Sequence, residues 1–217
     1  MARPSRPLPP RVFPPDLPPD LERGHLTRGG EVQAALVEGL AGDVDAAHAR
    51  VLESLIDAPD VGALVMDGAT LTDVEVRGIR AMTASFRAAR WQTVRVQGGR
   101  IATLDLSRAE LSGVELRGLR IDYLSLAGST VGDLLVVDCV IGSLDAPQAT
   151  LARVAFEGSR VEEVDDRGWK AEDVDLRGLE ALRFLDVAAL RGVTLDERQV
   201  TLLAPDLARA VGVDVRG

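Results

Sequence analysis

The chain has 217 residues, enough for one domain with a sizeable core, and 46% of them are apolar but only 3% aromatic. Its formal net charge of −9 disfavours non-specific binding to nucleic acid or acidic membranes. The single cysteine, Cys139, excludes an intrachain disulfide, and no run approaches the roughly 18 apolar residues of a membrane helix. We therefore expect a cytoplasmic protein with no direct nucleic-acid or membrane binding.

Residues 1–30 form a proline-rich N-terminal arm. Eight of the eleven prolines fall within the first twenty residues. Proline fixes φ and lacks an N–H group, which excludes a helix or a central strand and favours an extended, polyproline-like conformation. The arm is either a ligand for a groove on a partner, or a tail that lies over the first turn of the domain or is disordered. We expect the tail.

A five-residue repeat runs through residues 31–188. The related phrases VEVRG, VRVQG, VELRG and VDLRG begin at residues 74, 94, 114 and 174, all separated by multiples of 20. Every fifth residue from Leu36 to Ala181 gives 30 positions, of which 29 are apolar. None of the residues two places before these positions is charged. The remaining three positions of each five carry the charges, glycines and threonines.

This period predicts a square coil rather than a helix or a flat strand. A helix repeats its faces every 3.6 residues, and an odd period in a flat strand would alternate between the two faces. Two inward residues separated by one outward residue fit a short extended piece followed by a bend. Four such pieces complete one coil, which explains why the related phrases recur at multiples of 20. The repeat predicts roughly eight coils, or about 38 Å at the spacing of β-strands.

The pattern resembles that of the pentapeptide-repeat protein family, whose consensus is a small residue, a polar residue, a central Leu or Phe and two polar residues. The segments that match well are ATLTD (69–73), ASFRA (84–88), AELSG (109–113) and ATLAR (149–153). The resemblance covers about three-quarters of the chain. It implies an all-β fold, a right-handed quadrilateral β-helix solenoid.

Three residues of the repeat need separate explanations. Cys139 occupies an inward position where small and large residues alternate, so we expect it to be packed in the core rather than reactive. Asp166 is the one charged residue at a central inward position. We expect a local bulge that turns it outward, with a catalytic carboxylate as the alternative. Trp169 stands nearby in a usually smaller position and would fill the gap.

Residues 189–217 leave the five-residue frame. Apolar residues there follow the spacing of a helical face: Leu195, Val200, Leu203, Leu207 and Val211. Thr194 or Asp196 would cap the start of the helix, and Pro205 predicts a kink or two short helices. The segment is expected to be a helical cap over the last coil, or a homodimer contact of the kind that some pentapeptide-repeat proteins make through their C-terminal ends.

Charge is distributed unevenly along the repeat. Residues 31–75 carry a net charge of −9, residues 76–121 carry +6 and residues 122–186 carry −8. Two ladders stand out as a candidate interaction surface. Arg80, Arg100 and Arg120 are one coil apart, with Arg160 two coils further on, and the adjacent face carries Asp105, Asp145 and Asp165. The ladders either pair with each other or, in the alternative, contact an acidic partner surface.

No enzymatic constellation stands out. The two histidines, His25 and His48, have no repeated metal-ligand spacing, and no phosphate-binding or nucleophile motif occurs in a strand–helix context. We expect no enzyme activity and no cofactor or metal. The sequence favours a protein-binding or scaffold solenoid whose partner it does not identify. The alternative is a DNA mimic that binds DNA gyrase, as some pentapeptide-repeat proteins do, although the basic stretch of residues 76–121 interrupts the acidic surface that mimicry requires.

Overall fold

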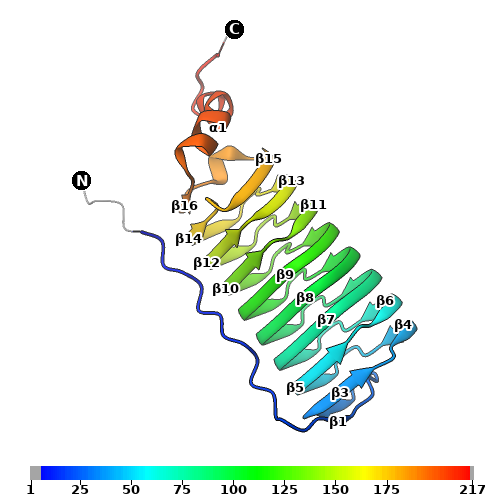
Figure 1. The fold of residues 1–217 in the computed structure, drawn as a ribbon. Coiled ribbons are helices and arrows are strands. Elements are labelled where there is room, and N and C mark those ends of the chain that lie inside the picture. Colours follow the sequence, from blue (N-terminus) through cyan, green and yellow to red (C-terminus); the bar gives the residue numbers. More distant parts are fainter. Residues whose placement is uncertain (1–5, 216–217) are drawn as a thin grey trace.

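A computed structural model describes residues 6–215 and shows a rod built almost entirely of parallel β-strands. The chain winds into a β-solenoid of about eight coils and ends in one short helix (Figure 1). The all-β solenoid and its C-terminal helix confirm the fold class predicted from the sequence.

The strands follow one another along the rod, and the longer ones continue around corners of the coil. Their bounds are β1 Glu22–Arg23, β2 Glu31–Gln33, β3 Ala35–Glu38, β4 Ala41–Asp45, β5 Arg50–Asp57, β6 Asp60–Val65, β7 Thr70–Ser85, β8 Arg90–Asp105, β9 Glu110–Ser125, β10 Thr130–Val137, β11 Val140–Asp145, β12 Thr150–Glu157, β13 Ser159–Asp165, β14 Lys170–Asp175, β15 Leu179–Phe184 and β16 Val193–Thr194. A 3₁₀ turn spans Val187–Ala189, and helix α1 spans Glu197–Ala210.

The central coils stack in a constant register. In the pairing of β7 with β8 and of β8 with β9, Val74 lies beside Val94 and Val94 beside Val114. Related residues therefore stack in columns one strand spacing apart, about 4.8 Å. This confirms the prediction that the recurring phrases occupy the same side of successive coils.

Corners separate the sides of each coil. In one central coil the corner residues Arg108, Gly113 and Gly118 have φ of 58°, 66° and 61°. Glycine adopts this left-handed conformation without steric cost, and Asp and Asn tolerate it better than most residues. The glycines and aspartates at the outward positions of the repeat thus have a conformational role in turning the chain.

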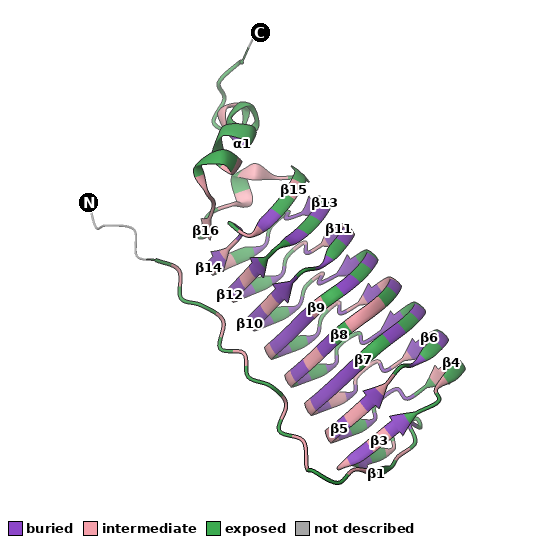
Figure 2. Cartoon of the chain, in the orientation of Figure 1, coloured by how far each residue is buried: buried purple, intermediate pink, exposed green. Residues whose placement is uncertain are grey.

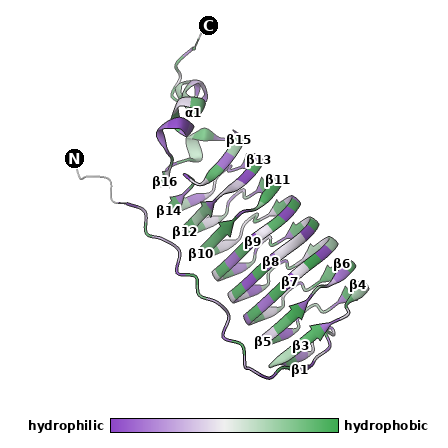
Figure 3. Cartoon of the chain, in the orientation of Figure 1, coloured by the Kyte–Doolittle hydropathy of each residue, from purple (hydrophilic) through white to green (hydrophobic). Residues whose placement is uncertain are grey.

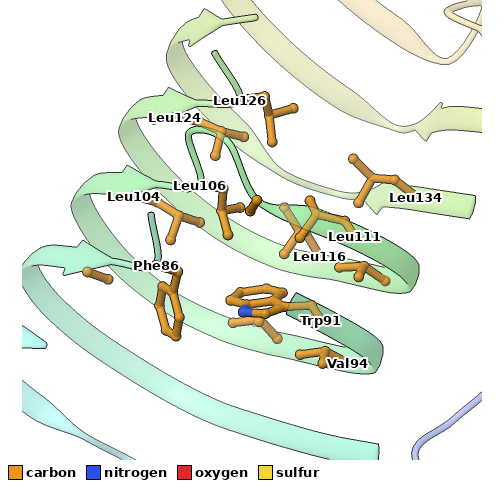
Figure 4. Close-up of a cluster of buried hydrophobic side chains, with 14 of the residues drawn as sticks. Phe86, Trp91, Val94, Leu104, Leu106, Leu111, Leu116, Leu124, Leu126 and Leu134 are labelled. Atoms are coloured by element: carbon orange, nitrogen blue, oxygen red, sulfur yellow. The ribbon is translucent and has the colours of Figure 1, made fainter. Parts of the chain in front are cut away.

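The core is one column of apolar side chains that runs the length of the rod. Figure 2 shows purple buried positions alternating with exposed ones along the strands, and Figure 3 shows the same alternation in hydropathy. Leucines pile up in the central coils, and Phe86 meets Trp91 edge-to-face with ring centroids 4.8 Å apart (Figure 4). Cys139 is 1% exposed within this core, which confirms its predicted packing.

The five-residue frame fails at both ends of the rod. Between β3 and β5, Leu36 pairs with Leu55, so this coil is shorter by a single residue than the central coils. The spacing of the central coils returns after a register shift between Gly42 and Asp43. The buried residues near Leu36 are Ala35 and Val37, so the predicted inward position of Leu36 was wrong.

The coil at the C-terminal end is shortened in the same way. Val174 pairs there with Val193, whereas Val154 pairs with Val174 in the usual register of the rod. An end coil has a neighbour on one side only, which relaxes the demand for a matching register.

The N-terminal arm runs along the rod instead of lying over its first turn. The described part of the arm begins beside the C-terminal coils and passes down to the opposite end, where β1 begins the solenoid (Figure 1). Main-chain N–H groups of Leu8, Arg11 and Asp16 donate hydrogen bonds to Asp173, Asp133 and Asp73, which lie two and then three coils apart. The expected placement was therefore wrong, and β1 already pairs with β3 inside the range assigned to the arm.

The C-terminal segment closes the rod with the residues that precede its helix. Leu190, Val193 and Leu195 are partly buried against the core. Helix α1 is a single helix that contains Pro205, so the prediction of two short helices was wrong. Asp196 caps it in a reciprocal capping box with Gln199. Within residues 6–215 no helix has the length and apolar character needed to cross a membrane.

Candidate interaction surfaces

The enclosed spaces of the described core are small and apolar. Among residues 6–215 no group of three His, Cys, Asp or Glu side chains could hold a metal ion. The enclosed spaces in the core are apolar and about 20 and 10 Å³ in volume. The charged columns on the outer faces are the candidate sites.

The basic column lies on one side of the rod, where β7, β8 and β9 run in register. Arg80 lies directly beside Arg100, and Arg100 beside Arg120. The next place in the column is taken by Val140, which is 48% exposed, and Arg160 follows it. The structure thus brings three of the four predicted arginines into one continuous row and separates the fourth by an apolar residue.

The three adjacent arginines are weakly compensated. Arg100 Nη2 lies 3.4 Å from Asp122 Oδ2, and among residues 6–215 neither Arg80 nor Arg120 has a carboxylate within ion-pair distance. Arg160, by contrast, lies 2.8 Å from Glu180. Two unit charges about 4.8 Å apart repel by about 0.9 kcal/mol even in bulk water. The row of Arg80, Arg100 and Arg120 is a surface on which an external anionic group would be stabilised.

Exposed apolar and aromatic groups border this row. Met82 is 68% exposed two residues after Arg80, and Tyr123 is 39% exposed three residues after Arg120. The Tyr123 hydroxyl donates a hydrogen bond to Asp145 Oδ2 at 2.9 Å, which fixes the ring at the edge of the face. Arginine beside exposed aromatic and methionine side chains is the composition enriched at protein–protein interfaces.

The predicted acidic column is mainly structural. Asp105 Oδ1 accepts a hydrogen bond from Ser107 N at 2.9 Å, and Asp165 accepts from the N–H and guanidinium of Arg167. A carboxylate that accepts from the N–H two residues ahead is a common device for turning the chain. The Arg167 guanidinium is the main reason that the pKa of Asp165 lies below its usual value.

The two ladders do not pair with each other. In the part of the chain that the structure describes, no ion pair joins Arg80, Arg100, Arg120 or Arg160 to the acidic column. The predicted pairing between ladders was therefore wrong. Asp105 and Asp165 each accept a hydrogen bond within their own corner, from a residue two places further along the chain. The columns compare residues 20 places apart and so do not reveal contacts between residues two places apart.

Asp166 points into the core, contrary to the expected bulge. Its side chain is fully buried, and Oδ1 accepts a hydrogen bond from Asp186 N at 2.7 Å, whereas Oδ2 has no partner among the described atoms. Burial raises the pKa of this carboxyl to about 6. Trp169 is buried nearby as predicted and donates through Nε1 to Ala189 O at 2.8 Å. A carboxyl without solvent access has no route to a substrate.

Glu115 forms the most buried ion pairs on the outer faces. It is 4% exposed and lies between Arg95 Nε, at 2.7 Å, and Arg117 Nε, at 2.6 Å. All three residues are outward positions of the repeat, so sequence reasoning treated them as ordinary surface charges. Glu115 is held by charge-assisted hydrogen bonds from both sides and contributes to the stability of the middle of the rod.

A third charged column, besides the basic and the acidic one, was missed in the sequence. Asp73, Asp133 and Asp173 are corner residues with φ of 52°, 62° and 53°, all separated by multiples of 20. They accept the three hydrogen bonds from the N-terminal arm, at 3.3, 2.9 and 3.1 Å respectively. The signal was present as a recurring Asp at one corner, but nothing in the sequence connected that corner to the prolines of the arm.

The C-terminal end presents exposed apolar side chains. Leu182 and Leu202 are 75% and 70% exposed, and Val200, at the start of α1, is 45% exposed. Gln199 attaches the helix to the last complete coil by donating to the carbonyl oxygens of Leu176 and Leu179, at 2.7 and 2.8 Å. This attachment leaves much of the helix, of which Leu203 is the buried residue, available to solvent.

Comparison of the chain with models of protein families and with curated proteins found no match.

Proposed function

We propose that this protein is a non-enzymatic binding or scaffold module whose basic row, Arg80, Arg100 and Arg120, contacts an acidic surface of a partner protein. The observation that carries this proposal is three stacked arginines with one long ion pair among them. An acidic partner would relieve their mutual repulsion, which gives association a favourable electrostatic term. The exposed Met82 and Tyr123 would supply apolar contact beside the charges.

The five-residue repeat, the constant register of the central coils and the left-handed corners support membership of the pentapeptide-repeat family, which remains part of the proposal. Solenoids present extended surfaces for binding rather than enclosed active sites. The buried single cysteine is compatible with the cytoplasmic location that we propose.

The binding proposal is tested by comparing three forms of the full chain as bait in lysate of the source cell. The first is wild type, and the second replaces Arg80, Arg100 and Arg120 by glutamate. The third is a control with the same charge change at the exposed basic residues Arg50, Arg108 and Lys170, which lie outside the row. We expect a specific partner to bind wild type and the control, and to bind the row variant at least about tenfold more weakly, equivalent to about 1.4 kcal/mol.

If the row variant binds the same partner as tightly as wild type does, the row is not the contact. If wild type repeatedly recovers no partner, the binding function itself is contradicted. The salt dependence separates the proposed contact from an apolar one. An electrostatic interface weakens steeply between low and physiological ionic strength, whereas an apolar one does not.

The alternative of a gyrase-binding DNA mimic depends on a continuous acidic stripe along at least one face. The column of Asp105 and Asp145 is interrupted by Ser125, and towards the N-terminus it continues with Ser85 and Val65. This column therefore lacks the continuous stripe that mimicry requires. A supercoiling assay with DNA gyrase distinguishes the two, because a mimic would change supercoiling at micromolar protein and the binding module would not.

We also propose that the C-terminal end forms a homodimer contact, because Leu182 and Leu202 expose apolar surface there. Sedimentation of the wild-type chain should show a dimer that dissociates on dilution. Leu202→Glu should give a monomer, while Met82→Glu, a change at an exposed apolar residue in the middle of the rod, should leave the dimer intact. A monomeric wild type at high micromolar concentration would contradict this contact.

A further inference from the structure

The N-terminal arm is bound to the rod through its main chain. Seven of the fourteen residues from 6 to 19 are prolines, which lack an N–H group. Of the remaining N–H groups, those of Leu8, Arg11 and Asp16 each donate to an aspartate Oδ1. The side chains are less engaged, since Leu8 is 55% and Phe13 69% exposed. Recognition of this kind depends on backbone shape more than on side-chain identity.

The spacing of these contacts matches a polyproline II helix. From Leu8 to Arg11 the chain advances three residues, or about 9.3 Å in this conformation, while its acceptors, Asp173 and Asp133, lie two coils or about 9.6 Å apart. From Leu8 to Asp16 it advances eight residues, about 25 Å, against five coils, about 24 Å. One turn of a polyproline II helix, which has three residues, therefore has nearly the same length as two coils of the rod.

The corner carries an aspartate at the coils where the arm has a main-chain N–H group to donate. Repeating the three-residue step beyond Arg11 brings Pro14 to the coil of residue 93, and that corner residue is Thr rather than Asp. At the coil of residue 133, Asp133 is also held by Arg153, whose Nε and Nη2 lie 2.6 and 2.8 Å from its carboxylate oxygens. This ion pair fixes the acceptor in place before the arm arrives.

The arm also has charge complementary to the corner. Hydrogen bonds from Arg177 are the main reason that the pKa of Asp175 lies below its usual value, and the charge of Arg6 lowers it further. Arg11 lies beside Asp133, and its main-chain oxygen would be 3.6 Å from a Cβ placed on Gly113. The small corner residue Gly113 thus leaves room for the arm to pass close to the rod.

We propose that the corner formed by Asp73, Asp133 and Asp173 is a binding site for proline-rich segments in the polyproline II conformation, and that residues 6–20 are its resident ligand. A proline-rich segment of another polypeptide, with N–H groups three residues apart and arginines among the prolines, competes for the same corner. This second binding surface is independent of the basic row and does not rest on the function proposed above. In cis the arm has the effective concentration of a tethered ligand, often millimolar, so it excludes most competitors until it is displaced.

The experiment removes the donors from the arm without changing its backbone preference. The donor-less chain carries Leu8→Pro, Arg11→Pro and Asp16→Pro, and the matched control carries alanine at the same three positions and so keeps every N–H group. The probe is a fluorescent synthetic peptide, RPLPPRVFPPDLPPD, with the sequence of residues 6–20. Binding is followed by fluorescence anisotropy with the full-length proteins.

We expect the peptide to bind the donor-less chain at least tenfold more tightly than it binds wild type or the alanine control. A peptide that carries the same three proline substitutions should bind none of them. In the donor-less background, Asp133→Ala should weaken peptide binding at least fivefold, while Asp138→Ala, at the next corner of the coil and equally left-handed with φ of 52°, should leave it unchanged. Equal affinity of the peptide for the donor-less chain and for wild type would overturn the proposal.

Proteolysis checks the resident ligand directly. Trypsin cleaves the arm after Arg11, and this bond should be cut at least tenfold more slowly in wild type and in Leu8→Ala than in Leu8→Pro, which lacks one donor. Cleavage of wild type as fast as of the free peptide would show that the corner does not hold the arm. A second copy of the chain as the bound partner would appear instead as arm exchange, with concentration-dependent protection, and would also contradict the resident arrangement.

Discussion

Replacement of Asp166 by asparagine should remove a pH dependence that this buried carboxyl imposes on stability. Burial raises its pKa to about 6 in the folded chain, against a usual value of 3.8. Between these values the folded chain keeps a proton that the unfolded chain has released, so the free energy of unfolding falls as the pH rises through this window. The resulting loss in the free energy of unfolding is about 3 kcal/mol, which is complete above pH 6 and absent below pH 3.8.

Asparagine isolates this effect because it keeps an oxygen for the N–H of Asp186 and does not titrate. Other carboxylates act in the opposite direction. Hydrogen bonds from arginine lower the pKa of Asp133 and Asp165, and their contribution to stability is lost as the pH falls. The difference between wild type and Asp166→Asn cancels these common contributions and leaves that of Asp166.

The assay is urea denaturation from pH 4 to pH 7.5, followed by the fluorescence of Trp169 in a Trp91→Phe background. Trp169 lies three residues from Asp166 and is 7% exposed, so it reports on the coils that contain the substitution even if the solenoid does not unfold as one unit. Asp166→Asn should match wild type near pH 4 and exceed it by about 3 kcal/mol at pH 7.5. A difference that stays constant across this range would show that Asp166 titrates normally and would refute the reasoning.

Three further predictions concern the corners, the outer ion pairs and the core. Gly99→Ala should lower the free energy of unfolding by about 3 kcal/mol, because φ of Gly99 is 122° and a Cβ there would lie 2.0 Å from a backbone oxygen. The control Gly98→Ala has open space around the new Cβ and should lower it by about 1 kcal/mol. Equal losses of the two variants in thermal denaturation would contradict this prediction. Glu115→Ala should cost about 2 kcal/mol and the exposed Glu110→Ala less than about 1 kcal/mol, so similar values in urea denaturation would count against a role for burial. Cys139 should react with a thiol reagent only as fast as the chain unfolds, and rapid labelling of the native protein would show that its position in the core is wrong.

The sequence by itself determined the central coils. The direction of each side chain follows from its place in the five-residue unit, and four units return the chain to the same side, so Val74, Val94 and Val114 had to stack once the coil formed. The core position of Cys139 follows from the same rule. These features are local, because each coil repeats the geometry of its neighbour.

Only the tertiary structure decided the features that break or ignore this period. Leu36 lies out of frame because the end coil is shorter by a single residue, and Asp166 stays inside because Asp186 N supplies a hydrogen bond there. The arm donates to aspartates that are far away in the sequence, for example from Leu8 N to Asp173. These contacts are possible because the rise of polyproline II matches the spacing of the stacked coils. The recurring Asp at one corner is visible in the sequence, but nothing there connects it to the prolines of the arm, so the contact becomes visible only when both are placed in space.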